Sequence, residues 1–406
     1  NAVDAALKAP GAIGGTTPAA GAFTSVSATT LTTPYANATV VAASGGDYTS
    51  IASAAAAASA GDTILVYPGT YTETVTIGVN NLSIIAAGSP FNTTLTQADA
   101  NVVDFGATTG GRIEGFTLNL SAVTTAKNLV QGSTGSFQVK TCRSMVTSAA
   151  ALNQADQPRI GKVTGAGTLQ FNLGKAIYAH TGACTTNAAI KAPFEAATGG
   201  TIKVYNLNQI DINGSGSALA TAVGLSAGTG YVVVDYCDID VDDDTTTYTV
   251  GMGYLASDTS VLNEFSHNQI HVHAAANNAY GALAVNATAR SSHNHIHVEC
   301  SGGGTAYSFV ETGTGEIDSH LDDIIATGGY SGNVNLVSSN ADGDLTITGT
   351  ATAGAITAGT ISAGATGFSV DADGDTTAKS VSVPATATGP QVTYWLEDSD
   401  NGSNYV

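Results

Sequence analysis

Four short segments in the middle of the chain combine acidic and imidazole side chains with alternating aliphatic residues. They are Asn208–Asn213, Cys237–Asp242, Asn268–His273 and Asn294–Glu299. In a β-strand, successive side chains point to opposite faces, so the aliphatic residues of each segment share one face and the polar residues share the other. If equivalent positions stack on one another, the polar faces form two outward columns. The first contains Asp211, Asp240, His271 and His297, and the second contains Asn213, Asp242, His273 and Glu299.

Asp240 and Asp242 form a candidate pair of catalytic carboxylates. They lie two positions apart on one face of a predicted strand, so their Cα atoms are about 6.6 Å apart. Glycoside hydrolysis uses two carboxyl groups roughly 5 to 9.5 Å apart whose pKa values differ. The pair therefore suggests a polysaccharide-cleaving enzyme, either a glycoside hydrolase or a polysaccharide lyase.

The same columns are compatible with two other roles. Imidazole and carboxylate groups bind divalent metals, and six of the eight histidines lie between residues 267 and 297. No HExxH or Cys/His zinc pattern accompanies them, so the favoured interpretation is a solvated surface or a polar stack that faces another subunit. No other cofactor is expected. The candidate ligands of a structural divalent metal are Asp242, His271, His273, His297 and Glu299.

The repetition of these segments predicts the fold. The first inward isoleucines, at positions 210, 239, 270, 296 and 324, follow one another at intervals of 26 to 31 residues. Each interval is long enough for one coil of a three-sided solenoid. One coil cannot bury its own apolar face, so only a stack of coils is stable. The sequence therefore predicts an all-β protein whose body is a parallel β-helix.

Changes in this rhythm divide the chain into three predicted regions. Residues 1–34 form an N-terminal connector, residues 35–330 the β-helix, and residues 331–406 a β-rich C-terminal shaft whose strands need partners from other subunits. Within the β-helix, residues 47–77 include an Ala-rich helix, from Ala52 to Ala60, that caps the first coil. Residues 149–200 break the rhythm and are interpreted as an irregular lateral insertion.

Composition excludes several classes of function. Hydrophobic residues make up 43% of the chain and charged residues only 11%, which is unlike a disordered protein. The net charge of −20 argues against binding to nucleic-acid phosphates or to anionic membrane surfaces. No apolar stretch is long enough to cross a bilayer, so no membrane insertion is expected. The chain begins at Asn1 without a methionine and is expected to be part of a longer one.

The first coil of the predicted β-helix contains a motif that resembles a known family. Residues 61–71 (GDTILVYPGTY), which follow the Ala-rich helix, resemble the opening of pectin-lyase-like right-handed parallel β-helices. In that family a helix covers the first coil and a Pro-Gly turn begins the stack. The resemblance implies a right-handed solenoid. It carries no information about activity.

Both ends of the chain resemble segments of tailed-bacteriophage fibre proteins. The similar segments are residues 9–28, residues 342–375 and residues 392–406. The resemblance implies a homotrimeric tail fibre or tailspike in the virion tail. Other fibre or virion proteins would bind its N-terminus, and bacterial surface polysaccharide would be its receptor. The favoured function is structural and receptor-binding, without catalysis. The alternatives are a polysaccharide depolymerase on the same β-helix and an extracellular filament or adhesin subunit of a cell.

Overall fold

The computed structural model describes one continuous solenoid and several short strands beyond it. The predicted connector 1–34 and most of the predicted shaft 331–406 lie outside the described residues. The described residues are 37–337, apart from 154–155, 186–189, 198, 215–217, 219, 228, 244–247, 257–261, 276–277, 286–287, 302–303, 313–315, 321 and 327–333, together with 361–362, 368–370, 376–378, 396–397 and 404–405.

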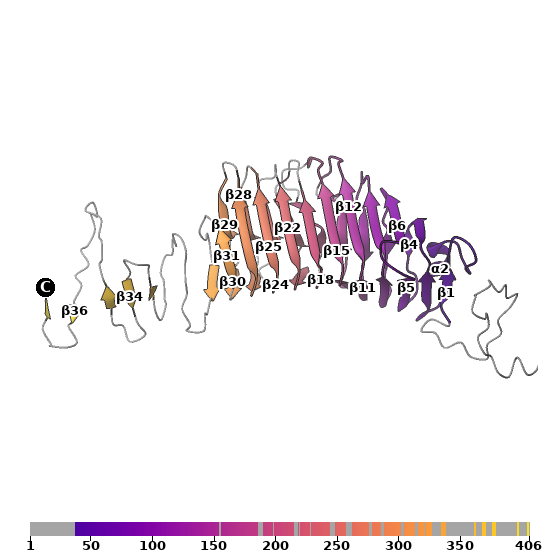
Figure 1. Cartoon of the computed structure of the whole chain (residues 1–406), viewed down its shortest axis with the longest axis horizontal. Coiled ribbons are helices and arrows are strands. Elements are labelled where there is room, and N and C mark those ends of the chain that lie inside the picture. The colour runs from indigo at the N-terminus through magenta and orange to yellow at the C-terminus, as the bar shows by residue number, and fades with distance from the viewer. Residues whose placement is uncertain are drawn as a thin grey trace, which may run out of the picture. The chain divides into compact units, whose positions relative to one another are not determined.

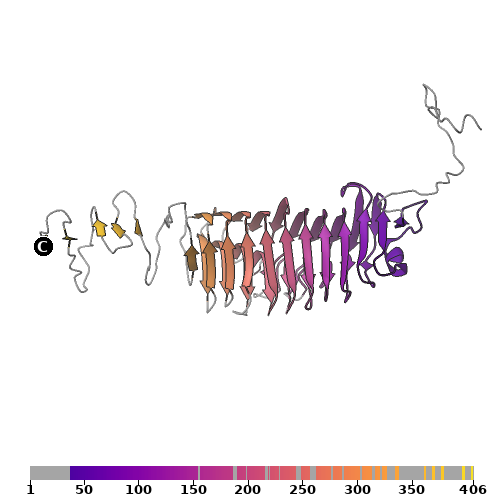
Figure 2. The same cartoon turned by 90° about the horizontal axis from the view of Figure 1, so that it is seen from below.

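Three parallel sheets form the solenoid, and each coil of the chain adds one strand to each of them in the order A, B, C (Figures 1 and 2). Sheet A has 12 strands: β1 (Thr39–Val41), β2 (Thr63–Val66), β5 (Leu82–Ala86), β8 (Gly110–Glu114), β11 (Ser136–Lys140), β14 (Thr168–Asn172), β18 (Thr201–Tyr205), β21 (Tyr231–Asp235), β24 (Leu262–Ser266), β27 (Thr288–Ser292), β30 (Glu316–His320) and β32 (Val334–Val337).

Sheets B and C have 10 strands each. Sheet B contains β3 (Gly69–Thr72), β6 (Thr93–Ala98), β9 (Thr117–Ser121), β12 (Arg143–Ser148), β15 (Lys175–His180), β19 (Gln209–Asn213), β22 (Asp238–Asp243), β25 (Gln269–Ala274), β28 (His295–Cys300) and β31 (Asp323–Ala326). Sheet C contains β4 (Val75–Thr76), β7 (Val103–Asp104), β10 (Asn128–Gly132), β13 (Arg159–Val163), β16 (Ile190–Lys191), β17 (Phe194–Ala196), β20 (Ala220–Ala227), β23 (Tyr248–Ala256), β26 (Asn278–Val285) and β29 (Ala306–Thr312). The predicted parallel β-helix is confirmed.

The interior is a set of aliphatic ladders, as the alternating pattern predicts. Ile210, Ile239, Ile270 and Ile296 pair with one another along sheet B, and each is at most 2% exposed. Burial of such side chains contributes about 1.5 to 3 kcal/mol each. Because each coil contacts only the coils above and below it, the stability of the body depends on the number of stacked coils.

A short helix covers the first coil. α2 (Ile51–Ala57) begins after Ser50, whose hydroxyl accepts a hydrogen bond from the Ser53 amide at 3.1 Å. The Glu73 carboxylate accepts hydrogen bonds from the first two helical amides, those of Ile51 (2.7 Å) and Ala52 (3.2 Å). A carboxylate at this end also complements the helix dipole. The predicted capping helix is confirmed, although it ends at Ala57 instead of Ala60. No helix in the described part of the chain is long and apolar enough to cross a membrane.

The interpretation of residues 149–200 as an irregular insertion is wrong. β13, β14, β15 and β17 from this segment are regular members of the three sheets. Two features disguise them in the sequence. The coil is longer here, since 34 residues separate Lys175 from its neighbour Gln209, against 26 between Asn268 and Asn294. In addition, an interior position of β13 is Gly161, where a Cβ atom would lie 2.5 Å from the Phe171 ring.

The short strands beyond the solenoid pair within the chain. β33 (Ile361–Ser362), β34 (Phe368–Val370) and β35 (Thr376–Ala378) form an antiparallel sheet, and β36 (Leu396–Glu397) pairs with β37 (Asn404–Tyr405). Antiparallel strands with short connections differ in kind from the parallel body. The predicted C-terminal shaft and the intertwining of subunits both stay predictions.

Candidate functional site

The two predicted columns form on the outer face of sheet B in the predicted register. Asp240 pairs with Asp211 on one side and His271 on the other, and His271 pairs with His297. In the second column Asp242 pairs with Asn213 and His273, and His273 pairs with Glu299. The register prediction is therefore confirmed.

His271 is the centre of the first column. Its Nδ1 atom lies 3.3 Å from Asp240 Oδ1, its Nε2 atom lies 3.1 Å from Glu299 Oε1, and its ring stacks on His297 with centroids 5.2 Å apart. Burial, and secondarily the negative charge of Asp242, raise the pKa of Asp240 above its ordinary value. A carboxyl group with a raised pKa beside another carboxylate is the arrangement that general acid catalysis needs.

The second column is held mainly by pairwise contacts. His273 Nδ1 lies 3.3 Å from Asp242 Oδ1, and its Nε2 atom lies 3.2 Å from the Ser301 hydroxyl. Within the described chain, no three His, Cys, Asp or Glu side chains converge on a point that could hold a metal ion. The predicted metal site and the predicted catalytic pair both stay predictions.

A second candidate site lies along the bends at which the chain passes from sheet A to sheet B. At six successive bends the first residue after the sheet A strand has a left-handed backbone, with φ between 51° and 55°. Asparagine and histidine are enriched in this conformation, but three of the six bend residues are a threonine, a leucine and a tyrosine, for which the left-handed region costs about 1 to 2 kcal/mol. Unfavourable backbone conformations are often retained at functional positions. The six bend residues are Thr141, Leu173, Asn206, Tyr236, His267 and His293.

The backbone of every bend is hydrogen-bonded to the next coil. The amide of each bend residue donates to the carbonyl group of the last residue of the following sheet A strand, for example Tyr236 to Ser266 and His267 to Ser292, with N···O distances of 2.9 to 3.3 Å over the six bends. The side chains of the bend residues are therefore not needed to satisfy the backbone, and they point outward.

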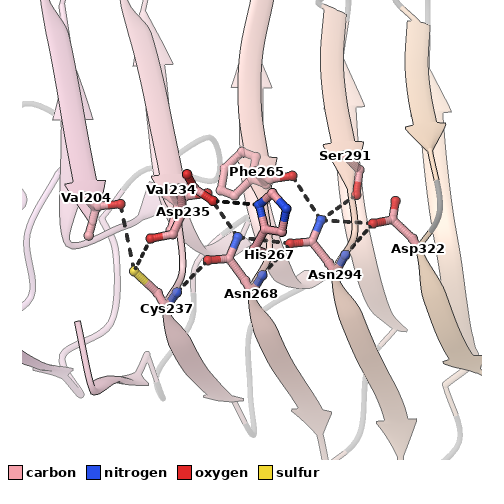
Figure 3. A network of polar contacts seen from close by, with 10 residues as sticks. All are labelled: Val204, Val234, Asp235, Cys237, Phe265, His267, Asn268, Ser291, Asn294 and Asp322. Atoms are coloured by element: carbon pink, nitrogen blue, oxygen red, sulfur yellow. Dashed lines mark hydrogen bonds and ion pairs between the residues drawn. The ribbon is translucent and has the colours of Figure 1, made fainter. Parts of the chain in front are cut away.

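At the last two of these bends the residue after the bend residue is an inward asparagine that connects the coils. Asn268 Oδ1 accepts from the Cys237 amide at 2.9 Å, and Asn294 Oδ1 accepts from both the amide and the side chain of Asn268 at 2.9 and 3.0 Å (Figure 3). Asp322 continues this ladder by accepting from the Asn294 amide at 2.8 Å. Burial raises the pKa of Asp322. The ladder fixes the bends that present the outward side chains.

The outward side chains of the bends stack on one another. The Tyr236 and His267 rings are 4.5 Å apart and nearly parallel, at 6°, and His293 stacks on His267 at 4.9 Å. His267 Nδ1 lies 3.1 Å from Asp235 Oδ1, which fixes the orientation of the imidazole (Figure 3). The Tyr236 side chain nevertheless remains exposed. The stack therefore presents a flat, immobilised ring surface to solvent.

Two adjoining hollows follow this bend, and together we call them the bend groove. One has a volume of about 390 Å³ and is lined by Tyr236, His267, Asp238 and Gln269. The other has a volume of about 440 Å³ and is lined by Phe91, Arg143 and Lys175. Both hollows are also lined by Leu173 and Asn208, so they form one continuous depression.

The bend groove gathers exposed apolar surface. In the described part of the chain five large hydrophobic residues are exposed, and three of them, Phe91 (74%), Tyr236 (56%) and Leu173 (49%), line the groove. Exposed apolar side chains that cluster beside polar groups mark interaction sites. The groove is therefore a candidate ligand site in the described part of the chain.

Replacement of Leu173 with asparagine should stabilise the protein. Asparagine tolerates the left-handed backbone, and the Leu173 side chain is exposed, so Leu173→Asn should raise the free energy of unfolding by about 0.5 to 1 kcal/mol. Denaturant unfolding measures the change. Ile325→Asn is the matched control, because Ile325 is equally exposed but has an ordinary backbone. Equal changes in the two variants would show that the Leu173 backbone is unstrained.

Sequence reasoning identified the columns and missed the bend groove. The missing signal was present: Tyr236, His267 and His293 each lie three residues before the first inward isoleucine of a sheet B strand. A recurrent ring at that spacing indicates an outward stack next to the strand. It was overlooked because a tyrosine in a left-handed bend contradicts ordinary backbone preference.

Comparisons with known proteins identify no family for this chain. No protein-family model matches the chain, and no curated protein matches it. One similar solved structure is a pectin methylesterase from carrot, with 12% identity, a TM-score of 0.36 and coverage of 70% of this chain and 85% of that one. Another is the A-module of the mannuronan C-5 epimerase AlgE6 from Azotobacter vinelandii, with 12% identity, a TM-score of 0.31 and coverage of 70% and 92%.

Proposed function

We propose that this protein binds an extended polysaccharide in the bend groove. The observation that carries the proposal is the exposed stack of Tyr236 on His267, which lies in a hollow together with the polar side chains of Asp238 and Gln269. The apolar face of a sugar ring packs on an aromatic ring, and its hydroxyl groups exchange hydrogen bonds with carboxylates and carboxamides around that ring. The groove supplies both kinds of contact.

The shape of the groove favours a chain over a small molecule. The two hollows are open and adjoining, and they follow successive coils that are spaced about 4.8 Å apart. Equivalent bend residues therefore recur along the groove at regular intervals. A polymer of repeating units can contact several of them at once, and the modest affinities of single units then combine.

The proposed biological context of this glycan binding is a fibre of a virion. We propose a homotrimeric tail fibre or tailspike that recognises bacterial surface polysaccharide, joined to other virion proteins through its N-terminus. The support is the resemblance of residues 9–28, 342–375 and 392–406 to phage fibre proteins. An extracellular filament or adhesin of a cell is the alternative setting. The bend groove would bind glycan in either one.

The Tyr236→Asn variant tests the proposal. Asparagine keeps the left-handed bend and removes the ring, so we expect about a tenfold or greater loss of affinity for any polysaccharide that binds, because removal of a central aromatic contact typically costs more than 1 kcal/mol. The measurement is binding to an array of bacterial capsular and O-antigen polysaccharides, followed by calorimetry on those that bind.

Tyr307→Asn is the control for this variant. Tyr307 is a partly exposed tyrosine of sheet C that stacks on Tyr280, away from the groove, and its replacement should leave glycan affinity unchanged. Equal affinities of the Tyr236 and Tyr307 variants would contradict the proposal. Light scattering of both proteins adds a second outcome: a lower mass for Tyr236→Asn alone would assign the ring to a subunit contact instead.

A polysaccharide depolymerase is the second candidate function. The observation in its favour is the raised pKa of Asp240 beside Asp242 on the same strand face. Their Cα atoms are about 6.6 Å apart, which allows the two carboxyl groups to reach the separations that glycosidases use. The chain length of each polysaccharide after incubation with the protein, compared with an Asp240→Asn variant, decides between binding alone and cleavage.

A further inference from the structure

The end of the bend groove at Arg143 and Lys175 differs in charge from the rest of the surface. Arg143 begins β12 and Lys175 begins β15, and the two residues are direct neighbours across sheet B. Both line the 440 Å³ hollow, whose lining includes no acidic residue. The adjoining hollow has the opposite character, since its lining includes Asp238 and no lysine or arginine. The groove is therefore electrically polarised along its length.

Arg143 differs from the other arginines in its charged contacts. In the described part of the chain, no Asp or Glu oxygen lies within 4.0 Å of its guanidinium group, whereas Arg112 contacts Glu114, Arg159 contacts Glu195 and Arg290 contacts Glu264. Lys175 is partly neutralised by Asp211, at 3.2 Å. In a chain with only 12 basic residues and a net charge of −20, an unpaired arginine in a hollow is a candidate ligand group.

The walls of this hollow suit a sugar ring. Phe91 lies in the connection between β5 and β6, which is longer than the later connections from sheet A to sheet B. The Thr117 hydroxyl anchors this connection by donating to the Pro90 carbonyl oxygen at 2.8 Å. Phe91 and Leu173 supply apolar contact surface, and Gln209 and Asn208 supply amide groups. The planar fork of an arginine matches two oxygens of one anionic group.

We infer that the Phe91–Arg143–Lys175 end of the groove binds an anionic substituent on a sugar, a carboxylate, a sulfate or a phosphate, while the Tyr236 end binds uncharged units. This inference rests on the proposed glycan binding and adds the charge and the direction of the ligand. The negative charge of the whole chain acts over long distances and opposes a polyanion. At physiological salt, charges more than about 8 Å apart are screened, so the local cations dominate.

The experiment uses acidic oligosaccharides from bacterial capsules in matched pairs, at 0.15 M salt. Each probe bears a carboxylate, a sulfate or a phosphate and is compared with the same oligosaccharide after reduction of the carboxyl group or removal of the ester. We expect the full-length protein to bind at least one anionic form about tenfold more tightly than its neutral counterpart, as one charge-assisted hydrogen bond provides. The three kinds of probe identify the anion.

Arg143→Met should abolish the preference for the anionic form, so that the variant binds the anionic and the neutral form with affinities within about twofold of each other. Arg112→Met, which removes an arginine of sheet A, is the control and should keep the preference. Arg143→Lys should retain part of it. Denaturant unfolding of each variant confirms that the fold is intact.

The outcomes separate the two proposals. This inference would be overturned if neutral glycans bind through Tyr236 and the protein shows no preference for anionic forms. It would also be overturned if a preference for anionic forms survives Arg143→Met. Either result leaves the proposed function intact. Binding that is insensitive to Tyr236→Asn would overturn the proposed groove itself. A protein that binds none of the probes or array polysaccharides would overturn both.

Discussion

Asn294→Ala should lower the free energy of unfolding by about 3 to 5 kcal/mol, the largest change expected from a single substitution outside the aliphatic ladders. The side chain is 2% exposed. Its Oδ1 atom accepts from two donors of Asn268, and its Nδ2 atom donates to the Phe265 carbonyl oxygen at 2.9 Å (Figure 3). Alanine would leave buried polar groups on both neighbouring coils without partners, and each costs about 1 to 3 kcal/mol.

Guanidinium unfolding of Asn294→Ala measures this contribution against Asn208→Ala. Asn208 is an exposed asparagine of an earlier bend, so the same substitution there should change stability by no more than about 0.5 kcal/mol. Equal unfolding midpoints would mean that the ladder contributes nothing net to the stack. A broader transition for Asn294→Ala alone would show that the solenoid has been divided into two separately unfolding parts.

Acidification from pH 6.5 to pH 4 should lower the free energy of unfolding by about 3 kcal/mol because of a single buried histidine, His180. His180 at the end of β15 is fully buried, and its Nε2 atom donates to the Ala150 carbonyl oxygen at 3.2 Å. Burial, assisted by the positive charges of Lys191 and Arg159, lowers the pKa of His180 to about 4. An unfolded histidine has a pKa of about 6.5, so protons bind preferentially to the unfolded chain in this window.

The sign of the effect follows from the direction of that shift. The stabilisation is complete above pH 6.5 and is lost as the pH falls toward 4, at about 1.4 kcal/mol per pH unit. His180→Gln should remove the slope. Although burial raises the pKa of Glu195, the charges of Arg159 and Lys162 outweigh that effect and lower it, so its contribution to stability is present above an unfolded pKa of about 4.5 and is lost as the pH falls below that value. A slope that persists in His180→Gln would assign the loss to other groups.

The sequence predicted what depends on alternation and repetition. The ladder of Ile210, Ile239, Ile270 and Ile296 and the register of the outward columns follow from period-two patterning, which side-chain burial enforces strictly. The same reasoning failed at β13, where Gly161 occupies an interior position so that the Phe171 ring fits. A glycine at an interior position interrupts the alternating apolar pattern of its own strand, although the core is still filled there by a ring from another strand. Such compensation involves residues from different coils and is invisible in any one segment.

The candidate site was only half predictable for a related reason. Asp240, Asp242 and the histidines of sheet B lie on strands, where spacing determines which side chains share a face. The bend groove depends on the backbone of residues such as Leu173 and Tyr236, whose left-handed φ contradicts their own preference. The neighbouring coils impose that conformation through hydrogen bonds from the bend amides. The residues of one bend alone do not predict this conformation, and only the recurrence of rings at equivalent positions of several coils indicates it.

The bends separate the part of each coil that maintains the fold from the part that meets a ligand. At each bend the backbone amide bonds to the next coil whatever side chain is attached. A change at Tyr236 or Leu173 therefore alters recognition without altering the path of the chain. Selection can revise the ligand specificity of such a protein one position at a time, and duplication of a coil lengthens the recognised polymer by a fixed step. Close relatives are expected to share the inward asparagines and to differ in the rings.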